Sequence, residues 1–125
     1  MNDNRPIILD ESAMLRYLLN DNKKQAREVR RFITSGNVYT YPELLARVAV
    51  TLRDTYNVPR KVIGEALSCM LDDVIVGEED SVRLACRLFG TTNHDFTDCL
   101  LLARNTLRGY RILSFDKGKQ KRILP

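Results

Sequence analysis

The stretch Pro6–Leu19, which reads PIILDESAMLRYLL, decides the fold that the sequence predicts. Its apolar run Ile7–Leu9 is hydrophobic on both faces, which is typical of a strand inside a parallel sheet rather than at its edge. The run ends at Asp10, and apolar residues then recur at helical spacing from Met14 onward. Open α/β sheets bind ligands where a strand turns into a helix in this way. Asp10 is therefore either a ligand-binding carboxylate or, like Ser12, an ordinary helix cap.

Three further β-prone runs alternate with helical patterns after this stretch. The runs are 37–40, 74–76 and 111–115, and Ile123–Leu124 is a candidate for a last short strand. Apolar residues recur at helical spacing in the segments 23–35, 42–56, 60–71, 82–88 and 95–107. Strands that alternate with helices predict a three-layer α/β/α fold with a central, mostly parallel sheet of four to five strands.

The composition indicates one domain, covering residues 1–125, that needs no disulfide or structural metal. The three cysteines (Cys69, Cys86 and Cys99) lie in apolar helical contexts and are expected to be buried free thiols in a reducing cytosol. A single histidine, His94, argues against a structural zinc site and is expected to be a surface residue. The sequence shows no signal peptide and no apolar run of the roughly 20 residues that a membrane span needs, so a cytoplasmic location is expected.

Three carboxylates are predicted to meet at one edge of the sheet. Asp10 and Asp116 each follow a predicted strand, and Asp98 lies in the first turn of a late helix. Carboxylates gathered at one place repel one another unless a cation lies between them, and Mg²⁺ prefers oxygen ligands. Such an ion can activate water for hydrolysis of a phosphodiester. Each acid also has an ordinary explanation, since Asp98 can complement a helix dipole, Asp95 can cap that helix, and Asp116 can belong to a turn.

Basic residues gather in two places. The formal net charge of +4 and a pI near 9.1 favour polyanionic partners mildly. Helix 23–35 and the tail after residue 116 carry the cations, which either form a solvated face or contact phosphate. The candidate nucleic-acid-binding residues are Lys23, Lys24, Arg27, Lys117 and Lys119.

Four stretches in order resemble PIN-domain proteins of the VapC toxin type across nearly the whole chain. The stretches are LDESAMLRYLLND (9–21), PELLARVAVTLRDTYNVPR (42–60), DFTDCLLLA (95–103) and ILSFDK (112–117). The resemblance implies a metal-dependent endoribonuclease that uses Mg²⁺ or Mn²⁺, and the toxin of a type II toxin–antitoxin pair. Its implied partners are RNA, a small antitoxin protein and a second copy of the chain.

The resemblance also implies roles for particular residues. It assigns the first acid to Asp10, with Ser12 as a small polar partner, and the third acid to Asp98, with Asp95 as an auxiliary residue. The fourth acid falls on Asp116. Asp10, Asp98 and Asp116 are thus the expected metal ligands.

At the second acidic position this chain departs from the family pattern, because Arg47 stands where the pattern has glutamate. Glu43 lies one helical turn earlier and is a candidate to replace the missing acid, or else a residue favoured by the helix dipole. Arg47 can pair with Asp10 or Asp98, point away, or bind the substrate phosphate. The alternative function is therefore a catalytically impaired PIN-fold module that binds RNA or regulates.

Overall fold

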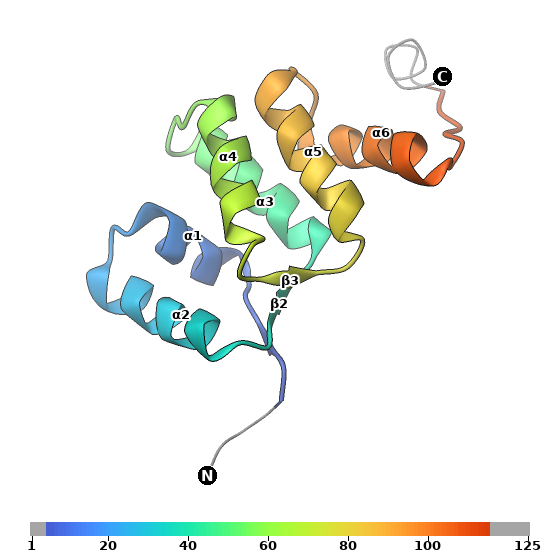
Figure 1. Ribbon diagram of the computed structural model, residues 1–125. Helices are drawn as coiled ribbons and strands as arrows, with labels where there is room; N and C mark the ends of the chain where they lie inside the picture. Colours follow the sequence, from blue (N-terminus) through green and yellow to red (C-terminus); the bar gives the residue numbers. More distant parts are fainter. Residues whose placement is uncertain (1–4, 116–125) are drawn as a thin grey trace.

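The computed structural model describes residues 5–115, and that part of the chain is built mainly from helices (Figure 1). Most of the predicted helices are present within a residue or two of their expected limits. The elements are β1 (Ile7–Ile8), α1 (Glu11–Leu19), α2 (Lys23–Ser35), β2 (Val38–Thr40), α3 (Pro42–Asp54), α4 (Arg60–Met70), β3 (Ile75–Val76), α5 (Glu79–Thr91) and α6 (Phe96–Arg108).

The strands form one small parallel sheet in the order β1-β2-β3. Ile8 lies opposite Tyr39, and Tyr39 in turn lies opposite Ile75, so the middle strand is β2. The first three predicted strands and their parallel direction are therefore confirmed. Each pair matches over only two residues, which leaves the sheet a minor part of the fold.

The predicted three-layer fold with a central sheet of four to five strands is wrong. Residues 111–115 form no strand, and the side chains of Leu113 and Phe115 are 85% and 90% exposed. β1 forms an edge of the described sheet, and Ile8 is 54% exposed, so the interior position predicted for Ile7–Leu9 is also wrong. The candidate strand Ile123–Leu124 lies outside the described residues. Burial explains the difference, because the core consists chiefly of residues from helices that pack on one another.

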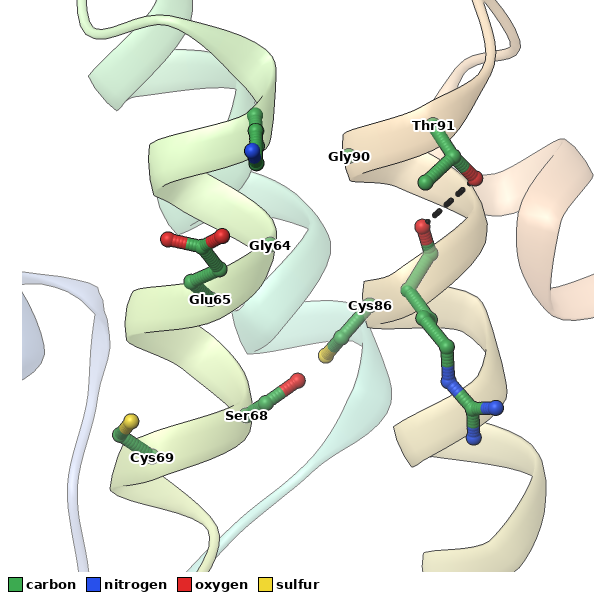
Figure 2. Close-up of a pocket in the computed structure, with 9 residues that line it drawn as sticks. Gly64, Glu65, Ser68, Cys69, Cys86, Gly90 and Thr91 are labelled. Atoms are coloured by element: carbon green, nitrogen blue, oxygen red, sulfur yellow. Dashed lines mark hydrogen bonds between the residues drawn. The ribbon is translucent and has the colours of Figure 1, made fainter.

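α4 and α5 approach each other closely because glycine faces glycine between them. A Cβ atom added to Gly64 would lie 2.6 Å from the carbonyl oxygen of Cys86 and 3.2 Å from the Cα atom of Gly90. Figure 2 shows these residues along the two helices, beside a groove of about 330 Å³. The absence of a side chain at position 64 therefore sets the distance between the two helices.

α3 is the helix on which both α1 and α6 pack. It begins at Pro42, which suits the first helical position because an amide hydrogen there would have no intrahelical acceptor. Its buried face carries Leu45, Val48, Ala49 and Leu52. The starts of α1 and α6, which carry two of the predicted acids, are thus placed relative to one common helix.

Arg60 forms three hydrogen bonds with the end of α5 and the loop before α6. The guanidinium of Arg60 donates hydrogen bonds to the backbone oxygens of Phe89, Thr92 and His94, and it lies 3.9 Å from the centre of the Phe89 ring. These carbonyls belong to the end of α5 and the loop after it, where helices leave backbone oxygens without partners. Arg60 therefore fixes how the chain enters α6.

The turn between β3 and α5 contains a strained residue. Glu78 has a left-handed backbone conformation with φ of 52°, which is uncommon for residues other than glycine. Its carboxylate pairs with Arg104 at 3.2 Å and with Arg108 at 3.5 Å, both on α6. The ion pairs connect the start of α5 to the C-terminal half of α6.

Burial tests the prediction made for the three cysteines. Cys86 and Cys99 are buried free thiols, as predicted, but Cys69 is exposed. Burial raises the pKa of the Cys86 thiol to about 12. Across residues 5–115, every helix is too short or too polar to cross a membrane.

Candidate functional site

Asp10 caps α1. Its Oδ1 atom accepts a hydrogen bond from the Ala13 amide at 2.9 Å and another from the Ser12 hydroxyl at 2.8 Å. The Ala13 bond, followed by the Ser12 bond, lowers the pKa of the Asp10 carboxyl below its usual 3.8. The side chain is nonetheless exposed, so the charged carboxylate can still meet a cation or a polar ligand. Capping and ligand binding are compatible at this residue.

Replacing Asp10 by asparagine removes the negative charge but keeps a side chain that can cap the helix, so it distinguishes the two roles. Asparagine caps helices about as well as aspartate, so we expect Asp10→Asn to change stability by a few tenths of a kcal/mol, and Asp10→Ala to lower it by about 1 kcal/mol. Because folding lowers the Asp10 pKa, its contribution is present above the unfolded pKa and is lost as pH falls through the folded pKa. Urea unfolding of the three proteins at pH 7 and pH 3 measures both effects. Equal losses in the two variants at pH 7 would contradict the capping role.

Arg47 pairs with an acid that the sequence did not single out. Its Nε atom lies 3.8 Å from a carboxylate oxygen of Glu11 in α1, and the Glu11 side chain also accepts a hydrogen bond from the Thr51 hydroxyl at 2.7 Å. These residues line a shallow hollow of about 380 Å³ between α1 and α3. Most of the Arg47 side chain is exposed. Among the predicted orientations, the one that points away from Asp10 and Asp98 fits best.

Glu43 lies on the first turn of α3 and is exposed. A carboxylate at this place is favourable because it complements the partial positive charge of the helix N-terminus. The structure gives this explanation a clear basis. Within residues 5–115 no contact marks Glu43 as the substitute for the missing second acid, so that role stays a prediction.

Asp95 and Asp98 lie at the start of α6. Asp95 occupies the N-cap position without a capping hydrogen bond from its side chain, and its carboxylate lies 3.7 Å from the Arg53 guanidinium of α3. Asp98 is half-buried in the first helical turn. Next to them His94 is half-buried, and its backbone oxygen accepts a hydrogen bond from Arg60. The arginine thus positions the turn that carries Asp98.

The predicted metal ligands are only partly described. Asp10 and Asp98 belong to helices that both pack on α3, while Asp116, Lys117 and Lys119 lie outside the described residues. Within residues 5–115, no three His, Cys, Asp or Glu residues gather as a metal-binding group. A hard cation such as Mg²⁺ is commonly held by one or two carboxylates and several waters, and an ionised, exposed Asp10 suits that chemistry.

The basic residues of α2 form a continuous surface. Lys23, Lys24 and Arg27 are exposed, and Arg30 and Arg31 extend the same side of the helix. None of the five makes an ion pair with another residue of the described range. This stripe is available to bind phosphate groups, because no acid within residues 5–115 forms an ion pair with it.

Sequence reasoning did not identify Glu11, Arg53 or Arg60 as residues that shape this region. The first two form ion pairs across helices that are far apart in the sequence, and Arg60 binds backbone oxygens about thirty residues away. Arginines and glutamates on helices are so common that no sequence signal distinguishes these from solvated residues.

Comparison with protein-family models, with curated proteins and with solved structures finds no match.

Proposed function

We propose that this chain is a metal-dependent endoribonuclease that hydrolyses RNA phosphodiester bonds, and that it is the toxin of a type II toxin–antitoxin pair. One observation carries the proposal: Asp10 and Asp98 lie at the starts of two helices, α1 and α6, that pack on the same helix, α3. The resemblance to VapC-type PIN-domain proteins is the second support. A cytoplasmic location, a small antitoxin and a second copy of the chain belong to the same proposal.

In this proposal Asp10 and Asp98 hold Mg²⁺ or Mn²⁺, with Asp116 as a further ligand. When bound, the ion would activate a water molecule and neutralise charge on the scissile phosphate. Ser12 holds the Asp10 carboxylate in position through the hydrogen bond at 2.8 Å. The exposed cations of α2 attract the RNA backbone electrostatically, and this attraction weakens as salt concentration rises.

A second function, an RNA-binding module without catalysis, is favoured by the ion pair between Arg47 and Glu11. A guanidinium occupies the position where the family pattern has an acid, and it already has a carboxylate partner at 3.8 Å. In such a protein the α2 stripe would bind RNA without a metal ion. The two functions share a ligand and differ in whether the RNA is cut.

A cleavage assay distinguishes them. The purified chain is incubated with labelled tRNA or a single-stranded oligoribonucleotide, with Mn²⁺, with Mg²⁺ or with EDTA. We expect metal-dependent cutting that falls by about a hundredfold or more in Asp10→Asn and in Asp98→Asn, because each removes a charge that would hold the ion. Arg47→Glu is expected to raise the cutting rate, because it restores an acid at the second position.

Glu65→Gln is the matched control, since it removes an exposed acid from α4, outside the proposed site. Circular dichroism confirms that each variant is folded. If neither the parent nor Arg47→Glu cuts RNA, and RNA binds equally well in EDTA, then the nuclease proposal is wrong and the binding module is supported.

A further inference from the structure

An apolar groove lies between β1, α1 and α2. Its volume is about 460 Å³, and apolar side chains supply much of its wall. Ile8 and Phe32 are 54% and 40% exposed there. The polar rim includes Glu28, which makes no ion pair with another residue of the described range. Large exposed apolar side chains around a groove are typical of a surface that binds another chain.

The groove adjoins an open edge of the sheet. Ile7 and Leu9 donate their amide hydrogens to Asn37 and Tyr39 on the β2 side. Successive amides of a strand point to opposite sides, so the backbone of Ile8 faces away from β2. Within residues 5–115 no strand lies on that side of β1. An extended peptide placed there could form backbone hydrogen bonds with β1 and insert side chains into the groove.

The same chain carries an apolar segment that matches such a partner. In Arg111–Phe115, residues 111, 113 and 115 are exposed while residues 112 and 114 are half-buried. Alternation with a period of two residues is the pattern of an extended chain with one free face. Leu113 and Phe115 are the apolar side chains on that face. Arg111 supplies a positive charge that complements Glu28, the acid among the described groove-lining residues, which also include Arg16.

The segment does not reach the groove of its own chain. It leaves the C-terminal end of α6, where the Asn105 side chain donates a hydrogen bond to the backbone oxygen of Tyr110, and Tyr110 donates its amide hydrogen to Arg104. In Figure 1 this end of the chain lies at the upper right, well separated from β1 at the lower centre. Within the described residues of one molecule the segment does not line the groove, so a second copy is the partner to consider.

We propose that two copies of the chain associate by docking the Arg111–Phe115 segment of one copy along β1 and into the groove of the other. Leu113 and Phe115 fill the groove beside Ile8 and Phe32, and Arg111 pairs with Glu28. Each copy has one segment and one groove, so two copies can exchange their segments reciprocally, which is the arrangement of a closed symmetric dimer. The groove includes Ser12, the hydrogen-bond partner of Asp10, so it adjoins the proposed nuclease site, but the association itself does not depend on nuclease chemistry.

Sedimentation equilibrium of the full chain over a range of concentrations tests the association. We expect a monomer–dimer equilibrium whose dissociation constant rises at least about tenfold in Phe32→Glu and in Leu113→Glu. Val62→Glu is the matched control, because Val62 is 48% exposed on α4, away from the groove. A parent that is monomeric at every concentration, or a dimer that neither groove nor segment variant weakens, would overturn the proposal.

Cross-linking identifies the contact directly. Ile8→Cys and Leu113→Cys are made as separate proteins, each with Cys69→Ser, which removes the exposed native thiol. After the two proteins are mixed and oxidised, we expect a disulfide-linked dimer that contains one chain of each kind. Absence of the mixed dimer would show that the segment does not dock on a second copy. A further protein carries both substitutions in one chain, and a disulfide that forms only within that chain would show the same. Neither experiment reads out RNA cleavage, so the nuclease proposal can fail without affecting the result.

Discussion

Gly64→Ala is expected to destabilise the folded protein by about 2 kcal/mol, within the usual range for overpacking a tight interface. The opposite sign would be expected in an ordinary helix, where replacing glycine by alanine stabilises by about 1 kcal/mol. Here the new methyl group would lie 2.6 Å from the Cys86 carbonyl oxygen, which belongs to the backbone of α5. The backbone cannot rotate out of the way as a side chain can, so the two helices must move apart.

Urea unfolding measures the loss, and the Cys86 thiol reports whether the helices separate. That thiol is buried and its pKa is raised to about 12, so it should react slowly with a maleimide in the parent and faster in Gly64→Ala. Gly77→Ala is the matched control, because a Cβ atom there meets no heavy atom within 4 Å. Unchanged or increased stability of Gly64→Ala would show that α4 and α5 are not held at this distance.

Arg60→Met is expected to destabilise the protein by about 2–4 kcal/mol. Methionine retains part of the apolar stem, but the oxygens of Phe89, Thr92 and His94 lose their common donor. Hydrogen bonds to a charged group are worth about 1.5–3 kcal/mol each, and losses within one network do not add fully. The cation–π contact with Phe89 is lost as well.

Thermal and urea unfolding measure this effect, and Arg60→Lys tests the role of the guanidinium. Lysine keeps the charge but offers a single nitrogen, so we expect it to recover only part of the stability. Lys61→Met is the control, since Lys61 is an exposed neighbour on the same helix. Full recovery in Arg60→Lys would mean that charge, and not the three-way hydrogen bonding, holds the loop before α6.

The helices were predictable because their apolar residues recur at a spacing that only a helix brings to one face, as in α3 with Leu45, Val48 and Leu52. The three strands were also predictable, since short β-prone runs that alternate with helices usually form strands of a parallel sheet. The fourth was not, because Arg111–Phe115 has the composition of a strand without a strand beside it in the described structure. Composition shows that a segment suits a sheet, but pairing decides whether it joins one.

For the candidate site, the sequence predicted the local roles of single residues but not the contacts between helices. The position of Asp10 after an apolar run predicted that a helix starts there. Asp10 does cap that helix, and its carboxylate is exposed. The partner of Arg47 could not be foreseen, because Glu11 lies 36 positions away and reaches it only after α1 has packed on α3. Whether acids meet depends on helix packing, which local patterns do not encode.

The left-handed backbone at Glu78 makes the connection between β3 and α5 sensitive to salt concentration. A glycine would adopt that backbone shape without strain, yet it could not reach Arg104 and Arg108. Charge attraction thus offsets an unfavourable main-chain geometry, and dissolved ions weaken the attraction while leaving the intrinsic cost of that geometry unchanged. The connection from β3 into α5 is consequently a place where electrolyte concentration acts on the shape of the backbone itself.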